Sequence, residues 1–154
     1  MNLLQMVRFT LSHPELARRI YRVGQIRQDL GGREPVENYP YALTMMTITR
    51  MVVQALRLGS IHGAVEKYNS VEAGADLLFA AVANELVYDW EERGLCVDDF
   101  NDVTEALRGQ CINNPKKLIK NLRETMSWEP SGKPADLNVM AALRSHKGEQ
   151  HPNV

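Results

Sequence analysis

The stretch SVEAGADLLFAAVANELVYDWEERG, residues 70–94, decides the fold of this chain of 154 residues. Ser70 is a preferred residue at a helix start, and Gly94 is the preferred residue just past a helix end. Between them, apolar residues recur at helical spacing. The pattern therefore predicts one long helix, from Ser70 to Arg93, as the central element. Its most apolar run, residues 77–83, is much shorter than the roughly 20 residues of a membrane span, so we expect no such span.

Helix start and stop signals continue on both sides of this stretch, while strand signals are nearly absent. Ser12, His13, Pro14 and Glu15 have the pattern of a capping box, which predicts a helix that continues to Leu30. Further helices are expected at residues 2–11, 41–58, 61–68, 100–108, 116–128 and from 136 to 143 or 144, with Asp98 or Asp99 as the cap of the fourth. We thus predict an all-α protein, a single compact bundle of about six or seven helices.

Length and composition are those of one globular domain. Hydrophobic residues make up 44% and charged residues 24%, which argues against wholesale disorder and against a fibrous protein. We expect a helical domain over residues 1–129, and a linker, a short C-terminal helix and a frayed tail over residues 130–154. Residues 1–11 lack the continuous apolar core of a secretion signal, and Cys96 and Cys111 are not spaced as a metal or redox motif. A cytoplasmic location with reduced thiols is therefore expected.

Charge is distributed unevenly along the chain. The net charge is +4 over residues 1–33, −8 over residues 34–110 and +3 over residues 111–154. Like charges that are crowded together raise the free energy unless a partner or counterions neutralise them. The layout therefore indicates surfaces that meet other charged groups. The acidic middle suits a basic partner, and the basic ends suit acidic protein or phosphate.

The helix expected over residues 41–58 is apolar on almost all sides. Tyr41, Met45 and Ile48 share one stripe, while other apolar residues and two arginines lie on the opposite side. Such a helix is either central in the domain or makes a second buried contact, as in a subunit interface. Both interpretations remain open. In the second, the partner or oligomer interface consists of Leu43, Met46, Arg50, Val53 and Arg57.

Glu72 and Asp76 lie on the same side of the long helix as its apolar residue Phe79. A carboxylate near an apolar core is costly unless a cation or hydrogen-bond donors meet it. We favour a structural pairing with Arg50 or Arg57. The alternative is a divalent metal ion, because hard cations bind carboxylate oxygens.

The run of residues 72–79 resembles the second acidic helix of the all-α nucleotide pyrophosphohydrolases related to MazG, and residues 95–98 are similar to the loop that follows it there. The resemblance implies an enzyme in which acids from two helices hold Mg²⁺ on a nucleoside triphosphate. Glu66, Glu72 and Asp76 would be the metal ligands. However, Ala73 stands where that family has a further acid, and residues 41–58 contain none. The alternative function is therefore a magnesium-dependent pyrophosphohydrolase with an incomplete acidic site.

A basic stripe marks the helix expected at residues 116–128. Lys116, Lys120 and Arg123 recur at helical spacing, and Lys117 lies beside them. The start of this helix adds the positive end of a dipole, which favours phosphate. The stripe is typical both of a nucleic-acid contact and of the solvated face of an amphipathic helix.

No catalytic or cofactor-binding residues are predicted, because the histidines are scattered and no glycine-rich phosphate loop follows a strand. We interpret the chain as a non-catalytic helical interaction or regulatory protein. A subunit or an inhibitor of a nucleic-acid-handling assembly would fit the charge layout. A protein partner or self-association is expected, nucleic acid is a further candidate, and no cofactor other than the alternative Mg²⁺ is predicted.

Overall fold

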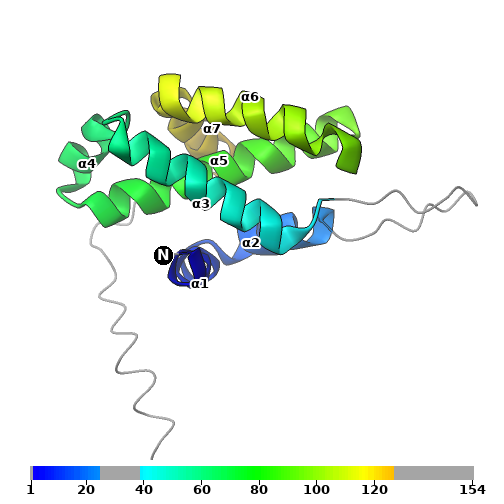
Figure 1. The fold of residues 1–154 in the computed structure, drawn as a ribbon. Helices are drawn as coiled ribbons and strands as arrows, with labels where there is room; N and C mark the ends of the chain where they lie inside the picture. The colour runs from blue at the N-terminus through cyan, green and yellow to red at the C-terminus, as the bar shows by residue number, and fades with distance from the viewer. Residues whose placement is uncertain (1, 25–38, 127–154) are drawn as a thin grey trace, which may run out of the picture.

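The computed structural model describes residues 2–24 and 39–126, and the predicted all-α class is confirmed there. The described residues form seven α-helices and one short 3-10 helix, with no strand among them (Figure 1). In chain order these are α1 (Asn2–Ser12), α2 (Pro14–Val23), α3 (Tyr41–Arg57), α4 (His62–Tyr68), α5 (Val71–Arg93), η1 (Val97–Asp99), α6 (Phe100–Asn113) and α7 (Pro115–Met126). The last predicted helix, after Asp136, lies outside the described residues.

Helix α5 is the central element, as its sequence predicts. Its start is capped by Ser70, whose Oγ accepts a hydrogen bond from the backbone N–H of Ala73 at 3.1 Å. Its end is Gly94, which adopts a left-handed conformation with φ of 59°. Every other α-helix packs against α5, and residues 77–84 are all buried. Because α5 is covered on nearly all sides, it lacks one continuous polar face.

The other helices surround α5 on several sides. In the view of Figure 1, α3 crosses in front of α5, α1 and α2 lie below, α6 lies above and α7 lies behind. Aromatic pairs tie these layers to the centre. The rings of Phe9 and Phe79 are 5.0 Å apart, and Tyr39 meets Trp90 edge-on at 4.8 Å. The hydroxyl of buried Tyr39 donates to the backbone oxygen of Ile20 at 2.8 Å, which satisfies its polar group inside the core.

The junction between α1 and α2 corrects the predicted capping box. Helix α1 continues through Ser12, so His13 occupies the N-cap position of α2 and makes no side-chain capping bond. The backbone N–H of His13 instead donates to the oxygen of Phe9 at 2.8 Å, and Pro14 fills the first turn of α2. Helix α2 ends at Val23 with Gly24 as its C-cap, earlier than the predicted end at Leu30.

The second half of the chain starts its helices close to where they are predicted. Asp99 occupies the N-cap of α6, but its carboxylate accepts from the backbone N–H of Cys96 at 2.9 Å rather than from α6. This hydrogen bond lowers the pKa of Asp99. Helix α6 runs five residues beyond the predicted end at Arg108, to Asn113. Both cysteines are free thiols, and burial raises the pKa of Cys111 to about 12.

Candidate partner-binding surface

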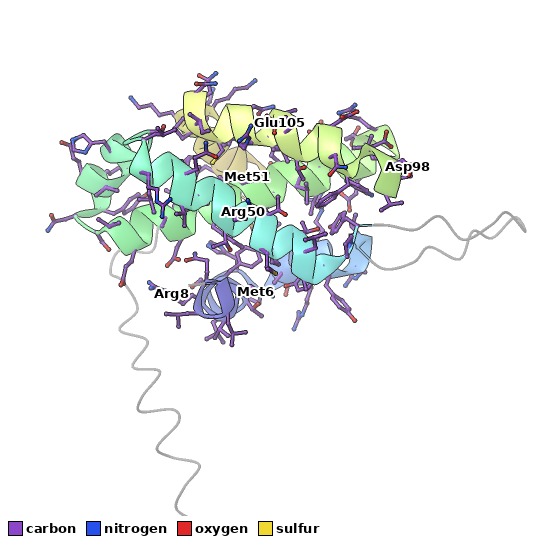
Figure 2. All side chains as sticks on the ribbon, in the orientation of Figure 1. Met6, Arg8, Arg50, Met51, Asp98 and Glu105 are labelled. Atoms are coloured by element: carbon purple, nitrogen blue, oxygen red, sulfur yellow. The ribbon has the colours of Figure 1, made fainter. Side chains whose placement is uncertain are left out.

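The outer stripe of α3 is formed by Leu43, Met46, Arg50, Val53 and Arg57. All of these side chains are exposed except Val53, which is partly buried. The opposite side of α3 contributes seven buried residues to the core. Figure 2 shows Arg50 on α3, which crosses the front of the molecule. Within residues 2–24 and 39–126, helix α3 therefore has one core face and one mostly exposed face of mixed apolar and basic side chains, and the interface predicted on that face stays a prediction.

A second apolar surface lies on α1, and sequence reasoning did not identify it. We call it the α1 stripe: Leu3, Leu4, Val7 and Leu11. Their side chains are all exposed, and that of Leu3 is 75% accessible. Steps of 100° place these four residues within one arc of the helix. This spacing was visible in the sequence, but nothing in the sequence alone said which side of α1 would face the core.

The inner side of α1 is more polar than its outer side. Gln5 and Phe9 are buried there, Met6 is partly buried against the core, and His13 is buried directly after the end of the helix. In Figure 2, Met6 and Arg8 lie on either side of the helix. Burial lowers the pKa of His13, and the nearby Asp76 carboxylate opposes that shift. Helix α1 thus attaches to the domain partly through polar contacts while four aliphatic side chains remain in water.

The acidic pair on α5 has an arginine partner, but not one of the two predicted. Arg8 of α1 contacts Glu72 at 3.2 Å and Asp76 at 2.9 Å. Gln5 also donates a hydrogen bond from Nε2 to Asp76 Oδ1 at 2.6 Å. The pairing of these acids with Arg50 or Arg57 is therefore wrong, although their need for a cation is met. The reason is topological, since α1 rather than α3 covers this part of α5 with a basic side chain.

The three acids of the magnesium interpretation are not assembled as one ligand set. Glu66 pairs with His62 at 3.0 Å within α4, while Glu72 and Asp76 pair with Arg8. Within residues 2–24 and 39–126, no three His, Cys, Asp or Glu side chains form a group that could hold a metal ion. The described geometry gives no support to a triphosphate site on α5.

The predicted basic stripe on α7 is only partly free. Lys116 and Lys117 are exposed, but Lys120 pairs with Glu124 at 3.5 Å. Arg123 turns toward α4 and donates from Nη2 to the hydroxyl of Tyr68 at 2.9 Å. The four cations therefore do not form one open row, and nucleic-acid contact here stays a prediction.

The α1 stripe and the outer stripe of α3 belong to helices that are in contact. At their junction the side chain of Thr10 hydrogen-bonds with Tyr41, which opposes the rise in the pKa of Tyr41 that burial causes. Tyr21 of α2 meets the ring of Tyr41 edge-on at 5.6 Å. The junction is therefore a packed part of the fold, flanked by two stripes whose side chains, apart from Val53, are exposed in the part of the chain that the structure describes.

Comparison with known proteins places this arrangement in a family. The model of the ELMO/CED-12 family matches residues 1–104, which include both stripes and the whole of α5. The chain belongs to the ELMO/CED-12 family. It is similar to ELMO domain-containing protein 3 from Bos taurus, at 23% identity over 65% of this chain and 26% of that protein. It is also similar to the protein of the same name from Mus musculus, at 24% identity over 77% of this chain and 30% of that protein.

This ELMO-family chain thus spans less than a third of the length of these relatives. No solved structure matches it. None of the helices described for residues 2–24 and 39–126 is long and apolar enough to cross a membrane. The family match takes in residues 72–79, and it gives no support to their resemblance to the MazG-related enzymes.

Proposed function

We propose that this ELMO-family domain is a non-catalytic interaction or regulatory module that binds a protein partner through the α1 stripe. One observation carries the proposal, namely that Leu3, Leu4, Val7 and Leu11 all face solvent on one side of a helix. Contiguous exposed apolar side chains of this kind mark interaction sites, whereas scattered ones are ordinary.

The energetics favour occupation of the stripe. Fully burying one leucine gains about 1.5–3 kcal/mol relative to leaving it exposed, so four aliphatic side chains can drive association without any catalytic group. The outer stripe of α3 extends the apolar surface beyond the α1–α3 junction, and Arg50 and Arg57 add charges that select the partner. We propose that both stripes belong to the same binding surface.

The experiment is a pull-down from the native host, read by mass spectrometry, with a surface variant and a matched control. The variant Leu4→Glu/Leu11→Glu places charges in the α1 stripe. The control Leu58→Glu places a charge on another exposed leucine, beyond the end of α3. We expect one partner to be lost with the double variant and kept with the control. A partner set that is identical for wild type and double variant contradicts the proposal.

Self-association is a finer version of the same proposal. Light scattering at micromolar concentration separates a second copy of this chain from a different protein. If a second copy covers the outer stripe of α3, Met46→Glu and Val53→Glu shift a dimer toward monomer. A wild-type monomer that remains monodisperse rules out the second copy and leaves the different protein.

A role within a nucleic-acid-handling assembly is a further refinement. Its support is limited to the exposed Lys116 and Lys117 of α7. Binding through them would weaken with salt, because each neutralised phosphate releases counterions. Failure of the wild type to shift single- and double-stranded probes at low salt removes this refinement and leaves the protein-binding proposal intact.

A further inference from the structure

A pocket of about 390 Å³ lies between α5 and α7. It is separate from both apolar stripes, because α7 lies behind α5 in Figure 1 while α3 crosses in front. The residues that line it are Asn84, Glu85, Tyr88, Asn121, Glu124 and Thr125. Two of them are carboxylates, and neither is used by the ion pairs that join α1 to α5.

Asn84 is the unusual member of this pocket. Its residue is only 2% exposed, and it interrupts the most apolar part of α5. Its side-chain Oδ1 has no hydrogen-bond partner among the described residues. A buried acceptor without a donor is costly, so a polar side chain at this position calls for a ligand or water that donates to it.

The carboxylates of Glu85 and Glu124 add acceptor oxygens to the pocket. Asn121 donates from Nδ2 to Glu85 Oε2 at 3.0 Å, and the hydroxyl of Thr125 donates to the backbone oxygen of Asn121 at 2.9 Å. These two hydrogen bonds occupy donor groups of Asn121 and Thr125. Glu124 pairs with Lys120 at 3.5 Å, and both side chains are exposed. An exposed pair of this kind is weak and yields readily to a better partner.

We propose that this pocket binds the guanidinium group of an arginine side chain presented by a partner protein. A guanidinium carries five N–H donors in a planar fork, which suits two carboxylates and an amide oxygen better than a compact ammonium does. The half-exposed ring of Tyr88 offers a face on which the planar cation stacks. The site thereby gives the acidic middle of the chain a definite place at which to receive a basic partner. It does not depend on the α1 stripe.

The test is an NMR titration of the full ¹⁵N-labelled chain with acetyl-Gly-Arg-Gly-amide at millimolar concentration. The matched probes are the same peptide with citrulline, which keeps the shape and loses the charge, and with lysine. We expect the arginine peptide to shift the side-chain amide signals of Asn84 and Asn121. We expect the citrulline peptide to shift neither, and the lysine peptide to bind more weakly.

Variants of the protein then test whether the arginine peptide binds in the pocket between α5 and α7. Glu85→Gln and Glu124→Gln should each weaken binding of the arginine peptide about fivefold, the loss of one exposed charge pair. Glu92→Gln removes the same charge from α5 outside the pocket and should leave the affinity unchanged. Asn84→Leu should abolish the shift of Asn121 while the circular dichroism spectrum shows a folded protein. Equal shifts with citrulline or lysine, no shift with arginine, or wild-type affinity in both glutamate variants would overturn the proposal.

Discussion

At the scale of single residues, the contact between α1 and α5 shows which pairings can be predicted from the sequence and which cannot. The sequence predicted that Glu72 and Asp76 lie beside apolar residues and pair with a cation. Both acids do pair with an arginine, but only Asp76 is partly buried, since the side chain of Glu72 is 74% exposed. Which arginine supplies the cation depends on how helices pack, and helical periodicity contains no such information. Arg8, 64 residues before Glu72 in the chain, takes the role because α1 folds back onto α5.

Replacing Asp76 by Ala is expected to lower the free energy of unfolding by about 1–2 kcal/mol, because Arg8 and Gln5 lose a charged hydrogen-bond partner. The loss stays below that of a fully buried pair, since the Arg8 and Asp76 side chains remain 33% and 23% exposed. Urea denaturation measures the change. Glu15→Ala breaks the exposed pair with Arg18 and serves as the control, with an expected change within about 0.5 kcal/mol. Equal changes in the free energy of unfolding for the two substitutions would show that the contact between α1 and Asp76 stabilises the fold no more than an exposed ion pair does.

His13 makes the stability of the domain depend on pH. Burial lowers its pKa in the folded state below the ordinary value of 6.5. The unfolded chain therefore binds the proton first as the pH falls, so the free energy of unfolding should decrease below about pH 6.5, until the folded-state pKa is passed. His13→Asn keeps a residue suited to a helix start and removes the titration. Between pH 7 and pH 5.5 the melting temperature of the variant should fall less than that of the wild type. An equal fall in both proteins would contradict the role given to His13.

At the scale of whole helices, the sequence predicted the existence of elements well and their junctions poorly. The caps of α5 are local signals, and both Ser70 and Gly94 act as predicted. The predicted capping box at Ser12 is wrong because α1 extends one residue further than predicted and includes Ser12, so His13 takes the N-cap position of α2. The α1 stripe was missed because spacing alone does not tell a buried apolar face from an open one.

Gly74 lies inside α5, and the packing of α4 against α5 explains why this position is a glycine. A Cβ at this position would lie 3.0 Å from Val65 Cγ2 and 3.3 Å from the Val65 backbone nitrogen. Glycine therefore lets α4 approach α5 closely. At Gly109, in α6, a Cβ would have no described atom within 4 Å outside the adjacent backbone of its own helix, so Gly109→Ala should stabilise the protein by about 0.5–1 kcal/mol through helix propensity. Gly74→Ala should instead destabilise it. Chemical denaturation of both variants checks the contrast, and stabilisation by both would refute the packing role of Gly74.

At the scale of the whole molecule, part of the uneven charge distribution is neutralised within the fold. Arg8 of α1 meets acids near the start of α5, and Arg19 of α2 meets Glu91 near its end. The basic N-terminal segment therefore binds the acidic middle of the same chain at two places. The carboxylates of Glu85 and Glu124 lie elsewhere, in the α5–α7 pocket, which is why we assign that surface rather than the α1 contact to a basic partner.

The bridge between α2 and α5 can be tested as a unit of the tertiary structure. Arg19 donates to Glu91 through both Nε and Nη2, and their side chains are 36% and 34% exposed. Arg19→Glu should destabilise the fold because two carboxylates then face each other, and Arg19→Glu/Glu91→Arg should recover part of the loss. For a pair this accessible we expect a coupling free energy of about 0.5–1 kcal/mol in a double-mutant cycle, and less at high salt. Arg18→Glu, on the same helix, cannot reach α5 in this geometry, so Glu91→Arg should not rescue it. Strict additivity of the Arg19 and Glu91 substitutions would mean that the charge layout does not hold these two helices together.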